Sequence, residues 1–163
     1  MSKENYRMRV GLGYDVHQFE KGDHVTLGGV VIPFNRGLKA HSDGDVVIHS
    51  AIDAILGAAA LGDIGMHFPD TDPRYEKMDS RILLQETEKL IRGDYVVVNL
   101  DITLIAESPK IKDYSREMVV RIASDLCIEP GDVNIKATTS EKMGFVGRGE
   151  GIAANSICLL HSI

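Results

Sequence analysis

The chain has 163 residues, of which 44% are hydrophobic, and a formal charge of −6 from 18 basic and 24 acidic residues. A chain of this length is typical of one domain that buries about 70% of its unfolded surface. The acidic balance argues against a nucleic-acid partner or a polybasic contact with a membrane, although local cations or a metal would still admit a phosphorylated ligand. With no repeat or long linker, we expect a single domain over residues 1–163.

Cys127 and Cys158 stand alone in apolar runs, without CxxC spacing, which predicts free thiols in a reducing, cytosol-like compartment. The opening segment, MSKENYRMRV, lacks the apolar core of a signal peptide. No run approaches the roughly 20 apolar residues of a transmembrane helix. These features predict a soluble, intracellular protein.

The first third of the chain predicts a strand, a hairpin and a helix. Residues 7–19 alternate loosely between polar and apolar, as a strand does, and residues 25–34 form two apolar runs around Gly28 and Gly29, a hairpin signal. Apolar periodicity then predicts a helix over residues 45–61.

Ser42 or Asp43 can cap this helix at its start. Residues 62–78 are dense in turn formers and are expected to form a loop, which at about 17 residues is longer than most connections. Asp79 or Ser80 then caps a second helix.

The second half predicts a strand over 95–106, a helix over 111–126, and strands over 132–139 and 151–162. In the first of these strands one face is expected to carry Val96, Val98, Leu100, Ile102 and Leu104. Helices and strands are mixed without a regular βαβ alternation. The predicted fold class is therefore α+β, a sheet covered by helices on one face.

A polar stripe runs along the first predicted helix. Asp45, His49 and Asp53 recur every fourth residue among apolar neighbours, so they share one face. Polar groups are costly in an apolar environment unless they are partnered. The stripe therefore predicts a ligand or a hydrogen-bond network.

Asp15 and His17 lie two residues apart on a predicted strand and project from the same face. They can supply two ligands of a zinc site, with His49 as the third and an open fourth position, as in catalytic zinc centres. The alternative is an exposed Asp–His pair and a hydrogen-bonded core histidine. Asp45 or Asp53 could support the ligands from one turn away.

A second polar cluster lies in residues 136–151, next to four glycines, and Glu141 in it suits a hard divalent cation. Its hydroxyls and cations suit phosphate oxygens, although it is not a Walker loop. The alternative is a glycine-rich turn with a solvated charged rim. The cluster comprises Lys136, Thr138, Thr139, Ser140, Glu141, Lys142 and Arg148.

Three other features carry weaker signals. Residues 68–73, FPDTDP, could form a lid over a ligand or only an Asx-turn before the next helix. Residues 11–16, GLGYDV, lack the third glycine of a dinucleotide fingerprint and lie inside a predicted strand, so we do not expect a dinucleotide-binding fold. His24, His67 and His161 have no partners visible in the sequence and are expected to be surface or incidental residues rather than catalytic ones.

Several of these stretches together resemble one family, the 2-C-methyl-D-erythritol 2,4-cyclodiphosphate synthases of the non-mevalonate isoprenoid pathway. The matching motifs are GYDVH, LGGVVIP, GLKAHSDGDVVIHSAIDAILGAAALGDIG, FPDTDP and DVNIKATTSEKMGFVGRGEGIA. They cover nearly the whole chain and leave residues 1–7 as a short N-terminal extension.

The resemblance implies a homotrimer whose active sites lie at subunit boundaries, each joining a metal site from one chain to a nucleotide pocket from the next. It implies Zn2+ or another divalent transition metal on Asp15, His17 and His49, with Asp45 and Asp53 in a supporting role only. A second cation, Mg2+ or Mn2+, would be held by Glu141 and bridge the diphosphate.

The resemblance also implies the substrate contacts. His41 and Ser42 fall on phosphate contacts, and Asp63, with the backbone of Ile64 and Gly65, on the ribose contact. His41 and Thr139 fall on catalytic positions. The other implied contacts are Asp15 and His17 beside the metal, Phe68, Pro69, Asp70, Thr71 and Asp72 over the substrate, Ala106, Pro109, Lys110, Ile111 and Lys112 near the cytosine and phosphate, and Thr138, Thr139, Ser140, Glu141, Phe145 and Arg148.

The implied reaction is an intramolecular attack of a 2-phosphate on the β-phosphorus of a cytidine diphosphate ester, which closes a cyclic diphosphate and releases CMP. Each pair of unit charges ~4 Å apart costs about 4 kcal/mol at an effective dielectric of ~20, so divalent metals are needed to offset the repulsion. Because the attacking group belongs to the substrate, no side-chain nucleophile is expected.

Two other functions fit parts of the pattern. One is a zinc hydrolase of nucleotide diphosphates, and the other is a non-catalytic, metal-binding structural trimer. The interpretation as a synthase places the chain in the cytoplasm of a bacterium, or in a plastid if the source is eukaryotic. It requires neither a nucleic-acid nor a membrane partner.

Overall fold

The alternating residues near the start of the chain form the long first strand of a mixed sheet. The computed structural model describes residues 7–163, so the first six residues of the predicted N-terminal extension lie outside the described residues. The strands are β1 (Met8–Glu20), β2 (His24–Leu27), β3 (Val30–Pro33), β4 (Gly37–Leu38), β5 (Tyr95–Ile105), β6 (Val133–Thr138) and β7 (Gly151–Ser162). The helices are α1 (Val46–Ala59), α2 (Ile64–His67), α3 (Ser80–Ile91), α4 (Ser115–Asp125) and α5 (Gly144–Gly147), with short 3-10 turns η1 (Pro73–Tyr75) and η2 (Pro130–Asp132).

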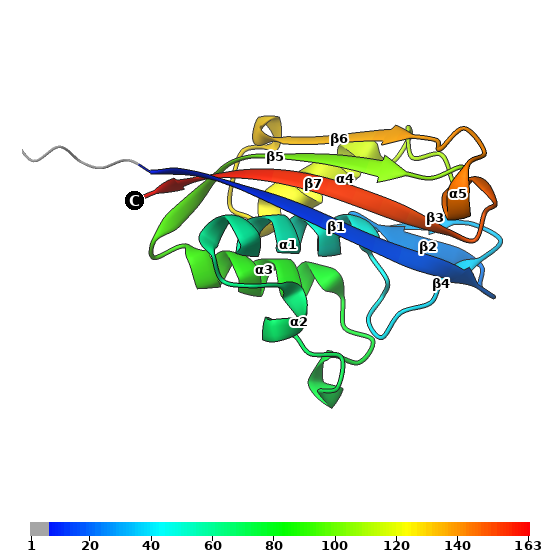
Figure 1. Ribbon diagram of the computed structural model, residues 1–163, viewed down its shortest axis with the longest axis horizontal. Coiled ribbons are helices and arrows are strands. Elements are labelled where there is room, and N and C mark those ends of the chain that lie inside the picture. Colours follow the sequence, from blue (N-terminus) through cyan, green and yellow to red (C-terminus); the bar gives the residue numbers. More distant parts are fainter. Residues whose placement is uncertain (1–6) are drawn as a thin grey trace, which may run out of the picture.

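The main sheet has five strands in the order β4-β1-β7-β5-β6 (Figure 1). β7 pairs antiparallel with both β1 and β5, whereas β5 and β6 are parallel, so the sheet is mixed. β2 and β3 form a separate hairpin around Gly28 and Gly29, both with positive φ, as the sequence predicts. The α+β class is confirmed.

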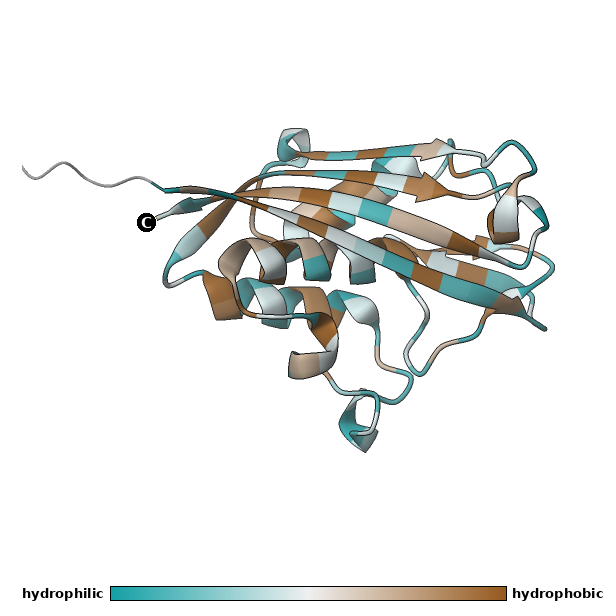
Figure 2. Ribbon diagram, in the orientation of Figure 1, coloured by the Kyte–Doolittle hydropathy of each residue, from teal (hydrophilic) through white to brown (hydrophobic). Residues whose placement is uncertain are grey.

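The helices cover one face of this sheet. α1 packs on β1 and β7, α4 packs on β6, and α3 lies against both α1 and α4 (Figure 1). Exposure alternates along β1: its inner residues face α1, and its outer residues remain uncovered within one chain. Figure 2 shows how apolar and polar residues are interspersed along these strands.

Gly11 and Gly13 allow α1 to approach β1 without an intervening side chain. A Cβ atom at Gly11 would meet the carbonyl oxygen of Ala54 at 1.9 Å, and one at Gly13 would meet that of Ser50 at 1.9 Å. Real Cβ atoms do not approach backbone this closely, so both positions require glycine. These glycines therefore set the distance between the strand and the helix that carry the predicted metal ligands.

The predicted face of β5 is wrong at its start. Leu100, Ile102 and Leu104 are buried together, but Val96 and Val98 are exposed and Val97 is buried instead. A register irregularity against β7 lies between Val97 and Asn99 and reverses the alternation there. Simple period-two counting cannot detect such a bulge.

Several element boundaries also differ from the prediction. Asp45, not Ser42 or Asp43, is the N-cap of α1, while Asp79 caps α3 as expected. α4 begins at Ser115, four residues later than the predicted start at 111, because a turn precedes it. The predicted loop over 62–78 contains α2 and η1.

Cys127 and Cys158 are both free, as predicted. None of the helices in the described part of the chain combines the length and the apolar character that a bilayer crossing requires.

The contact between α1 and β1 predicts opposite effects for two glycine substitutions. Gly13→Ala should lower the free energy of unfolding by about 1–3 kcal/mol, because the new methyl group forces the helix away from the strand. Gly57→Ala is the matched control, since a Cβ there meets nothing within 4 Å, and should raise stability by up to about 1 kcal/mol. Urea unfolding at one fixed protein concentration measures both, and equal stabilities would contradict this account of the contact.

Candidate metal centre and ligand pocket

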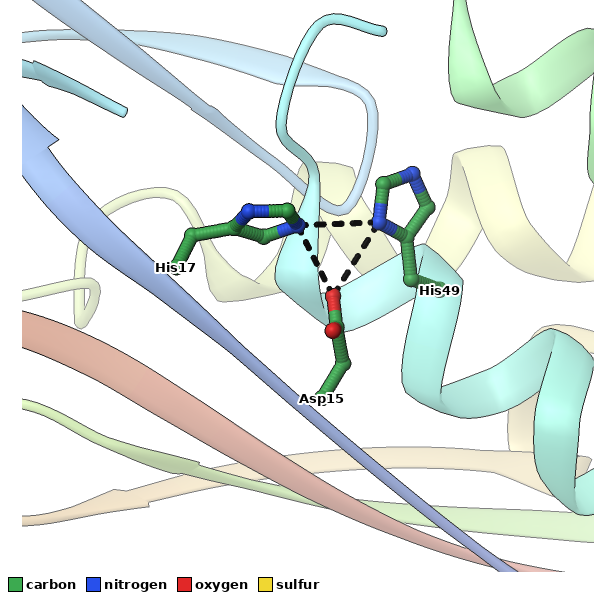
Figure 3. Close-up of side chains that lie close together, drawn as sticks. All are labelled: Asp15, His17 and His49. Carbon is green, nitrogen blue, oxygen red and sulfur yellow. Dashed lines mark hydrogen bonds and ion pairs between the residues drawn. The ribbon is translucent and has the colours of Figure 1, made fainter. Parts of the chain in front are cut away.

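Three predicted metal ligands converge at the junction of β1 and α1. The Oδ2 atom of Asp15 lies 3.0 Å from Nε2 of His17 and 3.0 Å from Nδ1 of His49, and the two nitrogens are 3.1 Å apart (Figure 3). Asp15 and His17 project from one face of β1, and His49 reaches them from the first turn of α1. The predicted convergence is confirmed.

The geometry of these ligand atoms fits a divalent metal. In a tetrahedral site with metal–ligand bonds of 2.0–2.1 Å, the ligand atoms are about 3.3 Å apart. The separations around Asp15 are close to this value. Nδ1 of His17 lies 3.2 Å from the carbonyl oxygen of Lys39, which can only accept a hydrogen bond. In a neutral His17 the ring proton is therefore on Nδ1, and Nε2 keeps its lone pair for a metal.

The charges of the three groups respond to one another. Burial by itself would raise the pKa of Asp15, but hydrogen bonds from His17 and His49 and their positive charge hold that pKa well below its ordinary value. Burial would likewise lower the pKa of His17, but its hydrogen bond and charge interaction with Asp15 raise it above 6.5. In the absence of a metal, a proton on His17 supplies the positive charge that the carboxylate favours.

The side chains of Asp45 and Asp53 hold backbone near the site, and the imidazole of His49 bonds to neither of them. Asp45 is fully buried and accepts backbone hydrogen bonds from Gly28 (2.9 Å) and Gly29 (2.6 Å) and from the first turn of α1. Its burial raises its pKa to about 6. Asp53 accepts a bond from the backbone of Ile64 at 2.8 Å and so fixes the start of α2.

A cavity of about 350 Å³ opens beside the metal ligands. Phe68 and Tyr75 meet edge to face within it, with ring centroids 5.6 Å apart. Sequence reasoning missed Tyr75 and Leu83, because one lies in a turn-rich loop and the other reads as an ordinary core position of α3. The lining comprises His17, Ala40, His41, Ser42, His49, Ile64, Gly65, Phe68, Asp70, Tyr75 and Leu83.

Two other residues of the 62–72 segment, Asp63 and Asp72, have local structural roles. Asp63 caps α2 through the backbone of Met66, and Asp72 caps η1 and pairs with Arg74 at 2.6 Å. The Asx-turn predicted as one alternative for FPDTDP is therefore present. Because Phe68 and Asp70 also line the cavity, the same segment forms one of its walls.

A second group of predicted residues lies around the ends of β5 and β6. A cavity of about 130 Å³ is lined by Ala106, Pro109, Lys110, Ala137, Thr138 and Thr139. An adjoining one includes Ile111 and Lys112. Phe145 lines a separate cavity together with His17, and Arg148 pairs with Glu150 at 2.6 Å.

Glu107, which the sequence did not single out, holds the loop of this second group. Its carboxylate accepts from the backbone of Ser140 (3.2 Å) and of Lys142 (3.1 Å) and pairs with the Lys142 ammonium at 2.9 Å. These contacts, led by the Lys142 side chain, lower the pKa of Glu107 to about 2. Within the loop, Glu141 has φ 53° and accepts a hydrogen bond from the Thr139 hydroxyl at 3.0 Å.

One chain does not bring Thr138, Thr139 and the segment 106–112 to the metal ligands, although Phe145 shares a cavity with His17. Val16 of β1 pairs with Ala153, Ala153 with Ile105, and Ile105 with Thr138, so both groups lie at the same end of the sheet. They are nevertheless three strands apart, about 14 Å at the usual spacing of ~4.8 Å. The two cavities share no lining residue.

The comparisons with known proteins agree with this geometry. The sequence profile of the YgbB family matches residues 8–161. The chain belongs to this family. It is 56% identical over 153 residues to the 2-C-methyl-D-erythritol 2,4-cyclodiphosphate synthase of Methylococcus capsulatus, an alignment that covers 93% of this chain and 97% of that one. The family resemblance read from the sequence motifs is confirmed.

Solved structures of the family share the fold. The bifunctional IspDF of Campylobacter jejuni superposes with a TM-score of 0.93 at 44% identity, covering 98% of this chain and 43% of that longer chain. A complex of Plasmodium falciparum IspF with CDP superposes with a TM-score of 0.82 at 36% identity, covering 94% of this chain and 95% of that one.

The raised pKa of His17 predicts how metal binding depends on pH. A metal must displace the proton from His17, so zinc affinity should fall as pH falls, and the decline should begin above pH 6.5 because the pKa is raised. Competition with a chromophoric chelator over about pH 5.5–8 measures this. His24→Gln, a change at an exposed histidine paired with Asp23, should leave the curve unchanged. Affinity that stayed constant down to about pH 6 would contradict the prediction.

Proposed function

We propose that this chain converts 4-diphosphocytidyl-2-C-methyl-D-erythritol 2-phosphate to 2-C-methyl-D-erythritol 2,4-cyclodiphosphate, with release of CMP, in the non-mevalonate isoprenoid pathway. The observation that carries the proposal is the convergence of Asp15, His17 and His49 beside an open cavity. Identity of 56% to a synthase of that name, over nearly the full length of both chains, supports it. The activity is that of a phosphorus–oxygen lyase.

The reaction brings two anionic phosphoryl groups together, and the proposed cations make this possible. Zn2+ or a similar metal on the Asp–His–His site, and Mg2+ or Mn2+ on Glu141, would offset the repulsion and stabilise the charge on the departing phosphate. Three protein ligands and one free position suit a metal that must contact substrate.

The chain's own residues would hold the substrate in a reactive conformation. His41 and Ser42 line the cavity next to the metal ligands and would bind one phosphate. Thr138 and Thr139 would bind the diphosphate from the second group. Fixing both ends gives an intramolecular reaction its advantage, with effective molarities of ~10⁵ M or more. Glu107 contributes by holding the loop of Glu141 in place before substrate arrives.

The two cavities suit the two halves of the substrate. Ile64, Phe68, Tyr75 and Leu83 give the metal-side cavity an apolar wall for the branched methylerythritol carbons. The cytidine would bind across the segment from Ala106 to Lys112, with its ribose at Asp63, Ile64 and Gly65. A family member is known in complex with CDP, which supports a cytidine nucleotide as ligand.

We further propose that the active form is a homotrimer with each site shared between two chains. The uncovered face of β1 carries Val10 (70% exposed) and Leu12 (67%), with Tyr14 and Val16 in the same row and Ile157 of β7 also exposed. A continuous apolar strip of this kind is typical of a subunit interface. A neighbouring copy would also supply the group of residues that lies three strands away within one chain.

The proposed location is the cytoplasm of a bacterium, or a plastid if the source is eukaryotic. Relatives of this chain include bacterial proteins such as that of Methylococcus capsulatus. The net charge of −6 supports a small-molecule partner rather than nucleic acid or an acidic membrane.

Incubation with the cytidylylated substrate, zinc and magnesium should give the cyclic diphosphate and CMP in phosphorus NMR. In ¹⁸O-labelled water neither product should carry label, whereas a hydrolase would incorporate it.

His49→Ala should lose both bound zinc, measured by elemental analysis, and product formation, because one of three metal ligands is removed. Full zinc occupancy in His49→Ala would overturn the assignment of the metal site.

Complementation between inactive variants tests the shared site. His49→Ala and Glu141→Gln damage different groups, so a trimer that contains both variants has one site with two intact halves. Random co-assembly at equal expression should restore about one quarter of wild-type activity, since about three quarters of trimers are mixed and each has one of three sites intact.

The matched control pairs His49→Ala with Asp15→Ala, which both damage the metal ligands and should restore nothing. Equal inactivity of the two mixtures would contradict a site shared between chains. Sedimentation equilibrium on each variant and each mixture establishes that the trimer forms.

A further inference from the structure

We propose that Ser80 and Asp43 are positioning residues that fix the tautomer and the orientation of His49 for metal binding. This inference rests on the proposed metal role of His49. Nδ1 of His49 faces Asp15, while Nε2 points away from the metal and lies 2.8 Å from the hydroxyl oxygen of Ser80. A metal can bind Nδ1 only if the ring proton is on Nε2.

The position of the Ser80 hydroxyl proton decides which way this hydrogen bond runs. Ser80 is the first residue of α3, and its side chain is fully buried. Its hydroxyl donates to one carboxylate oxygen of Asp43, and its backbone N–H donates to the other at 3.0 Å. Since a carboxylate only accepts, the hydroxyl proton of Ser80 is committed to Asp43, and the oxygen presents a lone pair to His49. Nε2 of His49 must therefore donate.

The result is a chain of hydrogen bonds that starts at His49, passes through the Ser80 hydroxyl and ends at the carboxylate of Asp43. His17 is fixed in an equivalent way by the backbone carbonyl of Lys39. Because each ring keeps a proton on its outer nitrogen, each can direct a lone pair at the space beside Asp15 once a cation displaces the proton held there. Ser42 also lies near Nε2 of His49, at 3.2 Å, but it is only half-buried and its oxygen accepts a bond from Gly44 as well.

Ser80 could instead serve only to start α3, and substitutions separate the two roles. Ser80→Ala removes the hydroxyl but keeps the backbone bond to Asp43. It should raise the zinc dissociation constant about 10–100-fold. Ser80→Thr restores a hydroxyl and should recover affinity. Asp43→Asn keeps the shape, but its amide can donate to Ser80, which turns the Ser80 proton toward His49 and should also weaken zinc binding.

Ser50→Ala is the matched control. Ser50 is fully buried and adjacent to His49 in sequence, but its hydroxyl bonds to Val47 and Ser156 on the side of the sheet. This variant should lose stability without losing zinc affinity. A chelator competition on the full-length protein gives the dissociation constants, and thermal unfolding gives the stabilities.

A second measurement reads the Nε2 hydrogen bond directly. Long-range ¹H–¹⁵N spectra of the zinc-bound, full-length protein should show a slowly exchanging proton on Nε2 of His49 in the wild type, and should show faster exchange in Ser80→Ala and Asp43→Asn. If both variants retain wild-type zinc affinity and a slowly exchanging Nε2 proton, the inference is overturned. If Ser80→Ala does not fold, Asp43→Asn decides by the same two readouts. The proposed metal site itself would instead be refuted if the wild-type protein bound no zinc, or if His49→Ala bound as much zinc as the wild type.

Discussion

The direct contact between the backbones of β1 and α1 determines the geometry on which the metal site depends. Gly11 and Gly13 leave no room for a side chain, so the helix lies against the strand at a fixed distance. That distance brings His49 within 3.0 Å of Asp15. A larger residue at either glycine would separate the ligands even though none of them had changed. The same contact is thus both a core-packing feature and a requirement for the site.

The metal ligands are held by regular secondary structure, and the diphosphate group is held by a loop that a charged side chain fixes in place. The metal ligands stand on a strand and a helix, which hold side chains more precisely than loops do. The diphosphate group stands on a loop, but Glu107 holds that loop by two backbone hydrogen bonds and an ion pair. At this loop the negative charge of Glu107 is already matched by hydrogen-bond donors before any ligand is present. Less reorganisation is therefore needed when a substrate with several phosphates arrives.

Local periodicity predicted most elements because burial imposes it, and the spacing of Asp15 and His17 placed them correctly on one face of β1. It failed where structure depends on pairing between distant segments. The bulge between Val97 and Asn99 arises from pairing with β7, and no local pattern marks it. Asp43 and Ser80 are 37 residues apart, so their link to His49 is invisible until the fold is known. The specific substrate contacts came from the family resemblance, because their residue types alone fit several functions.

The N-cap of α1 links the formation of this helix to that of the β2–β3 hairpin. The Asp45 carboxylate binds the first turn of α1 and, at the same time, the backbone of Gly28 and Gly29 at the tip of the β2–β3 hairpin. A hairpin of two short strands has little stability alone, and the first turn of a helix is the costly step in its formation. One buried carboxylate stabilises both, across a separation of 16 to 17 residues. We therefore expect docking of the hairpin and nucleation of the helix to be coupled during folding.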